Sequence, residues 1–140
     1  MTRDEMAAFV ERYVAAWASR EPGAMAAHWH DDGVLHHPAL SRDIDGRLVP
    51  YNNDNTKALI PEFEWRLSSW ASSGETLFIA WNNRGRIGDR LMEWSGVDLM
   101  TVREGRIREE TVYFDTYPLR RALDPTLPDH ALVDPDQLGR

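Results

Sequence analysis

The stretch from Arg90 to Asp115 constrains the fold more than any other part of the chain. Its pattern predicts two long strands joined by a tight turn at Glu104-Gly105. Because successive strand side chains point to opposite faces, one face of the first strand is apolar except for a single carboxylate. That face consists of Met92, Trp94, Gly96, Asp98, Met100 and Val102. An unpaired ionised carboxylate is unfavourable there, so we expect Asp98 to have a partner or a raised pKa.

The rest of the chain predicts helices first and strands afterwards. The amphipathic N-terminal segment carries Tyr13 and Trp17 one turn apart on its buried stripe, and Thr2 can cap it. The expected elements are helices over 2–20, 22–30 and 50–61, strands over 34–37, 62–70 and 76–81, the 90–115 hairpin, and a short helix over 119–123.

This order predicts an α+β fold, because the helices are segregated from a run of antiparallel strands. A long sheet that is apolar toward the helices should curl around them into a cone and leave an apolar cavity. The length suits a single domain, which we expect over 1–123. The acidic tail 124–140 contains three prolines and is expected to be irregular.

Composition excludes several classes of function. A net charge of −7 argues against a nucleic-acid or anionic-membrane partner. The absence of cysteine excludes disulfides, thiolate metal sites and a cysteine nucleophile. No signal peptide or membrane-spanning run is seen, so a cytoplasmic location is expected. Six tryptophans are more than a core of this size needs and suit an apolar ligand cavity.

Four histidines lie between positions 28 and 37, and a metal site would need most of them. His36 and His37 are adjacent on a predicted strand and should point to opposite faces, so both cannot ligate one ion without distortion. We therefore expect no metal, with one histidine of the pair directed toward the core.

Several segments, taken in order, resemble a nuclear-transport-factor-2-like domain of the SnoaL-like and ketosteroid-isomerase-like branch. They are Arg12–Ala16 in the first helix, Val34–Pro38 after an Asp-Asp turn, Gly96–Leu99, Glu104–Ile107, Tyr113–Asp115 and Leu119–Leu123. The resemblance covers about residues 5–123. It implies a cone-shaped sheet around the helices, no cofactor, and a homodimer that packs the outer sheet faces. Leu77, Ile79 and Trp81 would supply that interface if they face outward.

The resemblance also implies roles for four residues. Tyr13 falls where ketosteroid isomerases have the oxyanion-hole tyrosine, and Asp98 where they have the protonated aspartic acid beside it. His37 replaces their carboxylate base and can still move a proton. Asp115 resembles the acid/base of polyketide cyclases, although the pattern leaves open whether Asp115 or Phe114 faces the cavity, since a bulge would exchange them.

The sequence thus favours an enzyme of enol or enolate chemistry: an isomerase, cyclase or dehydratase acting on an apolar, polycyclic or polyketide-like carbonyl compound. Trp17, Trp94, Met100 and Phe114 are the expected substrate-binding residues. An epoxide hydrolase would instead need Asp98 and Asp115 bridged by an arginine such as Arg84. A non-catalytic binding domain is a third hypothesis, in which Asp98 only partners Tyr13 and Asp115 only caps the terminal helix.

Overall fold

The computed structural model describes residues 1–129 and 133–139, and it has three α-helices and a curved, six-stranded mixed sheet. The α+β prediction is confirmed. The elements are α1 (Arg3–Ala18), a 3₁₀ turn (Ala26–His28), β1 (Trp29–His36), β2 (Ile44–Asp45), α2 (Val49–Leu59), β3 (Glu64–Ser73), β4 (Thr76–Ile87), β5 (Arg90–Arg103), β6 (Arg106–Tyr113), α3 (Tyr117–Leu123) and a second 3₁₀ turn (Pro135–Gln137).

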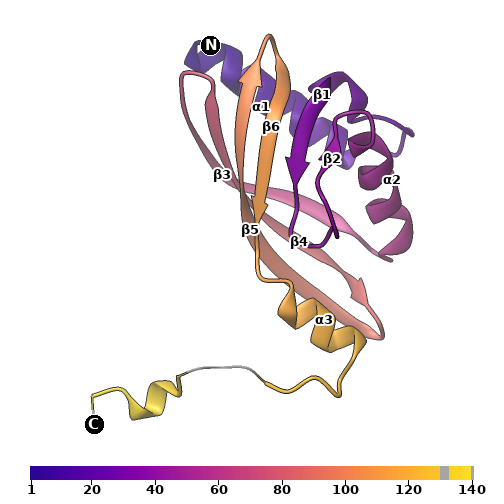
Figure 1. Cartoon of the computed structure of the whole chain (residues 1–140), viewed down its shortest axis with the longest axis vertical. Helices are drawn as coiled ribbons and strands as arrows, with labels where there is room; N and C mark the ends of the chain where they lie inside the picture. The colour runs from indigo at the N-terminus through magenta and orange to yellow at the C-terminus, as the bar shows by residue number, and fades with distance from the viewer. Residues whose placement is uncertain (130–132, 140) are drawn as a thin grey trace.

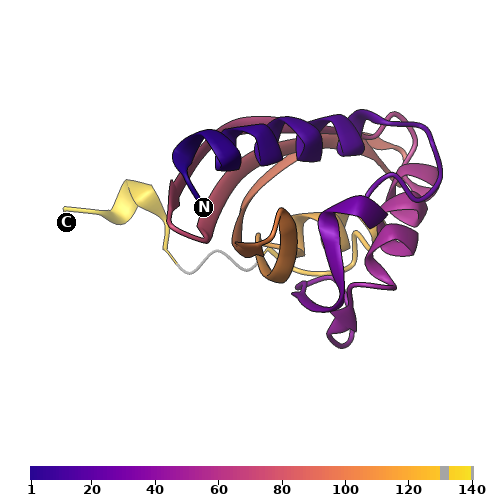
Figure 2. The same ribbon diagram turned by 90° about the horizontal axis from the view of Figure 1, so that it is seen from above.

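The sheet has the order β2-β1-β6-β5-β4-β3. Strands β3 to β6 form the expected antiparallel run, whereas β1 pairs with β6 in parallel. Figures 1 and 2 show how the long strands twist and curve, with α1 lying along the sheet and α2 beside β1 and β2. No helix in the described part of the chain has the length and apolar character to cross a bilayer.

Helix α1 begins where its sequence predicts. The Thr2 hydroxyl accepts the Glu5 backbone N–H, and the Glu5 carboxylate accepts the Thr2 N–H, so both residues satisfy donors that the first turn leaves free. At the other end, Lys57 of α2 donates to the carbonyls of Ala16 and Ser19 at 2.9 Å each. This contact fixes α2 against the C-terminal end of α1, where a positive charge is favourable.

The alternation predicted for β5 is confirmed. Asp98, Met100 and Val102 are buried, whereas Val97 and Leu99 point to the opposite face. Because Ile79 is the register partner of Asp98, the inward set of β4 is Leu77, Ile79 and Trp81, all buried. The expectation that these three residues face outward is therefore wrong. The outer face of β4 carries the alternate residues Phe78 and Ala80 instead.

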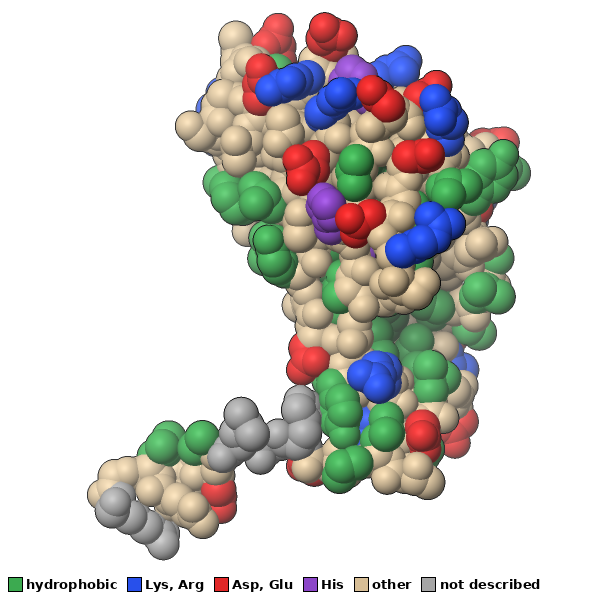
Figure 3. Space-filling view, viewed as in Figure 1, with side chains coloured by type: hydrophobic (Ala, Val, Ile, Leu, Met, Phe, Trp, Pro, Cys, Tyr) green, Lys and Arg blue, Asp and Glu red, His purple; other side chains and the backbone are tan. Residues whose placement is uncertain are grey.

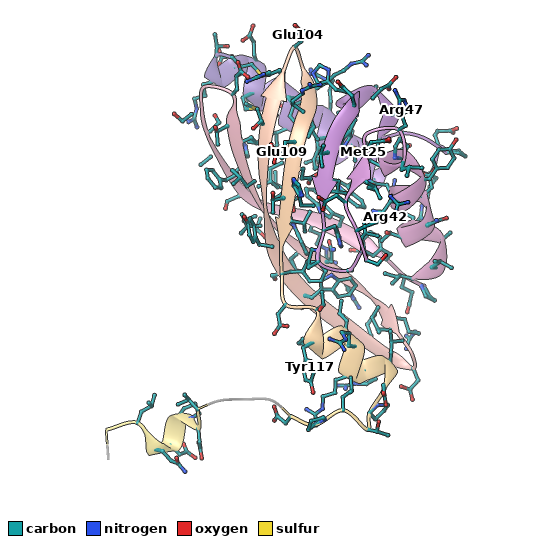
Figure 4. All side chains as sticks on the ribbon, viewed as in Figure 1. Met25, Arg42, Arg47, Glu104, Glu109 and Tyr117 are labelled. Carbon is teal, nitrogen blue, oxygen red and sulfur yellow. The ribbon has the colours of Figure 1, made fainter. Side chains whose placement is uncertain are left out.

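The β5–β6 hairpin turns at Glu104 and Gly105, with φ of 54° and 75°, and Glu104 lies at its tip (Figure 4). Two successive positive φ values give a turn whose twist matches the flanking strands. Just beyond, the register shifts: Val102 pairs with Ile107, but Thr101 pairs with Glu109, leaving Arg108 as the extra residue of a bulge. The bulge decides which side chains of β6 face inward.

Several predicted segments differ from the structure. Strand β1 begins at Trp29, five residues before the expected start, so the expected Asp-Asp turn lies within the strand. The segment 22–30 contains only a 3₁₀ turn at Ala26–His28, because a helix this short is marginal and Trp29 is instead buried in β1 opposite Ile107. Strand β4 extends to Ile87, beyond the apolar run 76–81. Its distal half alternates polar outward residues with the inward Asn83, Gly85 and Ile87.

Helix α3 follows the sheet at the end opposite the N-terminus, and the described part of the tail runs from it away from the rest of the molecule (Figure 1). Tyr117 begins α3 (Figure 4), and its hydroxyl donates to the carbonyl of Pro128. Figure 3 shows apolar side chains gathered around α3 and charged side chains of both signs over the opposite end.

Candidate functional site

A cavity of about 180 Å³ lies between α1, α2 and the inward face of the sheet. Its walls are mainly apolar and aromatic, with polar groups contributed by Tyr13, His37, Asn83, Asp98 and Glu110. For scale, an apolar cavity of about 150 Å³ holds one benzene molecule. The cavity therefore has room for one ring with a substituent, and it is partly open, so a larger compound could extend out of it.

Asp98 is buried in this cavity wall with 3% of its surface exposed. The indole Nε1–H of Trp81 donates to its Oδ1 at 2.8 Å. Gly96 makes room for this contact, because a Cβ at position 96 would lie only 2.4 Å from Trp81 Cζ2. Burial raises the pKa of Asp98 to about 6, while hydrogen bonds from Glu110 and Trp81 act in the opposite direction.

Glu110 is the second buried carboxyl group of the site, and the sequence analysis missed it. It is 4% exposed and lies next to Asp98 on the cavity wall. Burial first, and then the nearby Asp98 charge, raise the pKa of Glu110 well above its ordinary value. Both shifts favour retention of a proton by the pair, with the protonated carboxyl group of Glu110 as the donor and Asp98 as the acceptor.

The bulge at Arg108 explains why Glu110 is inside. Strict alternation from the buried Ile107 would bring Glu109 inward and leave Glu110 outside. The extra residue reverses this phase, so Glu110, Val112 and Phe114 face the cavity. A register shift of this kind leaves no clear signal in a single sequence.

Tyr13 lies where the resemblance predicts, at the cavity wall and only 2% exposed. Its hydroxyl donates to Glu110 Oε1 at 3.3 Å. Burial, followed by the charges of Glu110 and Asp98, raises the pKa of Tyr13 well above 10, so the phenol stays protonated. Tyr13 thus supports the carboxyl pair, and Asp98 and Tyr13 are brought together as predicted, with Glu110 between them.

His37 also lines the cavity, in edge contact with Phe114 at 5.5 Å between ring centroids. The backbone N–H of Ala39 donates to its Nδ1 at 3.1 Å, so the proton of the neutral ring resides on Nε2. Burial lowers the pKa of His37 to about 4. At neutral pH the residue is therefore an uncharged hydrogen-bond donor, a different state from the titrating base expected from the sequence.

Asp115 lies outside the cavity. Phe114 takes the inward position, whereas Asp115 is exposed and accepts the backbone N–H of Tyr117 at 2.9 Å. This contact is the helix-capping alternative considered for it. Arg84 is on the outer side of β4, and no arginine is among the described residues that line the cavity. The Asp98–Arg84–Asp115 cluster required for the epoxide hydrolase hypothesis is therefore not assembled.

Among the four expected substrate-binding residues, Trp17, Trp94 and Phe114 line the cavity. Met100 does not: it is fully buried in the core beneath the site. The other histidines of the 28–37 segment do not gather around one point. His28 packs against Phe9 and Tyr13, while His36 lies outside the cavity between Asp43 and Glu109, which is visible on β6 in Figure 4. Within the described residues no three potential ligands gather to hold a metal ion.

The family model described as the SnoaL-like domain matches residues 10–110, well over half of the chain. The chain belongs to the SnoaL-like family. No curated protein sequence matched it.

Solved structures share the fold of this SnoaL-like domain at low sequence identity. A protein with a ketosteroid isomerase-like fold from Catenulispora acidiphila, in complex with trimethylamine, is 18% identical, with TM-score 0.69 over 76% of this chain and 85% of its own. IdmH, a candidate polyketide cyclase from Streptomyces antibioticus, is 17% identical, with TM-score 0.71 over 84% and 96%. A Mycobacterium tuberculosis LEH-like epoxide hydrolase is 21% identical, with TM-score 0.68 over 86% and 90%. These neighbours establish the fold and include proteins of enzymatic families.

Proposed function

We propose that this SnoaL-like domain catalyses enolisation of a compact carbonyl compound, with the Asp98–Glu110 pair as the proton-transfer group. The carrying observation is a pair of buried carboxyl groups, Asp98 and Glu110, side by side at the wall of an apolar cavity, where burial raises the pKa of both. Such an arrangement is a recognised way to obtain a carboxylate base effective near neutral pH. No cofactor is needed for this chemistry.

In the proposed step, ionised Asp98 takes a proton from the carbon next to the substrate carbonyl. The C–H electron pair moves into a carbon–carbon double bond, and the carbonyl oxygen becomes an enolate. The uncharged His37 donates its Nε2–H to that oxygen, because its Nδ1 is already occupied by Ala39. Return of the proton at another carbon gives isomerisation. Attack of the enolate on a second carbonyl gives cyclisation, and loss of a hydroxyl group gives dehydration.

This proposal reverses two of the roles expected from the sequence. His37 was expected to move the proton, yet its pKa of about 4 and its acceptor at Nδ1 suit a neutral donor. Asp98 was expected to be a protonated donor, yet Trp81 donates to it and Glu110 shares its proton with it. Asp115 has no part in the proposed step, since its carboxylate caps α3 outside the cavity.

The test is solvent exchange at an enolisable ketone. Wild-type protein should accelerate the replacement of the acetophenone methyl protons by deuterium in D₂O, followed by proton NMR. Asp98→Asn and Glu110→Gln should each reduce the enzyme-dependent rate by about 100-fold or more, the usual contribution of a general base or acid.

Glu109→Gln provides the matched control. It is the same change one residue away, on the outward side of the bulge, and should leave the exchange rate unchanged. An Asp98→Asn protein that folds and exchanges protons at the wild-type rate would refute the proposal. It would favour the non-catalytic binding hypothesis.

A further inference from the structure

Several polar side chains other than the carboxyl pair line the cavity, among them Asn52, Asn53, Thr56 and Asn83. Asn83 lines the cavity wall with 8% of its surface exposed, and its Oδ1 is buried without a hydrogen-bond partner among the described residues. A buried, unsatisfied acceptor costs free energy unless something in the site donates to it. The feature therefore points to a ligand group with a hydrogen to donate.

Asn83 lies further along the sheet than the carboxyl pair. Its register partner on β5 is Trp94, four residues from Asp98, so the two inward positions are about 13 Å apart along the strand. Trp81, which donates to Asp98, occupies the inward position between them on β4. A ligand that reaches both must place its donor away from the reacting carbonyl.

Aromatic side chains surround this position. Asn83 pairs with Trp65 on one neighbouring strand and with Trp94 on the other. Trp17 stacks on Trp65 with ring centroids 5.6 Å apart and planes 6° from parallel. Phe63 closes the cluster, with centroids 6.0 Å from Trp17 and 6.3 Å from Trp94. Flat faces around a single acceptor favour a planar ring that carries a donor at its edge.

We propose that Asn83 accepts a hydrogen bond from a ring hydroxyl of the substrate, on the side of the ring remote from the reacting carbonyl. This inference rests on the proposed function for the position of the carbonyl and adds the substrate class: a hydroxylated aromatic or cyclic ketone. A hydroxyl donates one hydrogen and remains uncharged, so it enters an apolar aromatic site at lower desolvation cost than a protonated amine.

The experiment compares two probes that differ at one group. Dissociation constants for 4-hydroxyacetophenone and 4-methylacetophenone are measured by NMR titration, since hydroxyl and methyl groups are nearly equal in size. The wild-type protein should bind the hydroxy compound about tenfold more tightly, the value of one neutral hydrogen bond to an otherwise unsatisfied acceptor. In Asn83→Leu, which keeps the branched shape of the side chain and removes the acceptor, that preference should disappear.

Asn82→Leu is the matched control. Asn82 is the neighbouring residue on the outward side of β4, where it donates to Ser95 at 3.0 Å, and its replacement should leave the tenfold preference intact. A third probe needs only wild-type protein: 4-fluoroacetophenone cannot donate and should bind no more tightly than the methyl compound.

Equal affinity of wild-type protein for the hydroxy and methyl probes would overturn the inference, even if Asn83→Leu failed to fold. So would a preference that survives in a folded Asn83→Leu protein. The result is separable from the proposed function because binding is measured without turnover. Asp98→Asn should lose proton exchange and keep the hydroxyl preference, so a failure of the proposed chemistry and a failure of the Asn83 contact give different results.

Discussion

At the scale of single residues, the site depends on how burial changes the pKa values of ordinary acidic and basic side chains. Asp98 and Glu110 are carboxyl groups that would both be ionised in water at pH 7. In the cavity the pKa of each is raised, chiefly because burial disfavours the charged form, and for Glu110 also because the Asp98 charge lies nearby. His37 is affected in the opposite direction, since burial disfavours its charged form. The cavity therefore contains one carboxylate base and one neutral imidazole donor at the same pH.

This assignment predicts the pH dependence of proton exchange. Asp98 acts only when ionised, so the exchange rate should be low in acid, rise with a midpoint near pH 6 and level off above it. His37 is already neutral throughout that range, because its pKa is about 4. His37→Gln should therefore lower the plateau rate about tenfold to a hundredfold and leave the midpoint in place, as measured by exchange of acetophenone between pH 4.5 and 8. A variant in which the midpoint vanished would identify His37 as the base.

Some of these residues were predictable from sequence and others were not. Asp98 and Tyr13 were identified correctly as cavity residues because each lies on a long, regular apolar pattern, one of period two and one of period 3.6. Glu110 was missed because the bulge at Arg108 changes the phase of β6 between Ile107 and the site. The neutral state of His37 depends on its burial, and the position of its proton depends on the Ala39 backbone N–H, neither of which a residue pattern encodes.

At the scale of elements, the long β4–β5 pair determines the shape of the site. The inward row Trp81–Gly96 places a large indole across a strand that has no side chain at that point. This combination lets Trp81 reach Asp98. The regular alternation of β5 made its inward face predictable, whereas the pairing of a tryptophan with a glycine depends on register.

The pairing makes Gly96→Ala a sensitive test of this geometry. An added Cβ would lie 2.4 Å from Trp81 Cζ2 and 2.6 Å from the Tyr113 carbonyl oxygen, so the indole or the strand must move. Overpacking of this kind should reduce the free energy of unfolding by about 1–3 kcal/mol, measured by urea denaturation. Loss of the indole hydrogen bond should also raise the Asp98 pKa and shift the exchange midpoint upward.

Trp81→Phe separates the two effects. It removes the donor to Asp98 but retains an aromatic ring, so it should shift the exchange midpoint upward without the steric conflict. Gly96→Ala protein with wild-type stability and an unchanged midpoint would show that the Trp81–Gly96 pairing does not hold Asp98.

Among other elements, α1, α2 and the β5–β6 hairpin followed their sequence signals, while 22–30 did not, because the burial of Trp29 in the sheet outweighed a weak helical pattern.

At the scale of the whole molecule, the sheet separates two environments. One face, together with α1 and α2, encloses the cavity. The other carries an apolar patch formed by Phe78, Val97 and Tyr113, which are 47%, 39% and 57% exposed. Val97 pairs directly with Tyr113, and Phe78 pairs with Leu99 next to them, so these side chains are neighbours across three strands. Exposed apolar groups gathered on one sheet face commonly mark a contact with another protein.

We expect this patch to be where two copies of the chain meet, because the face is apolar and a two-fold axis would place each patch against its own equivalent. We expect wild-type protein to sediment as a dimer at micromolar concentration and the Phe78→Glu variant as a monomer. In the variant the two-fold axis would bring the two introduced carboxylates close together in an apolar interface, where they repel each other. Leu123→Glu, at an exposed leucine of α3 outside the patch, is the control and should leave the dimer intact. Wild-type protein that sediments as a monomer at 100-fold higher concentration would refute the expectation. The outer patch and the cavity share strands β4 to β6, so Phe78→Glu protein that retains proton exchange would show that each subunit forms a complete site by itself.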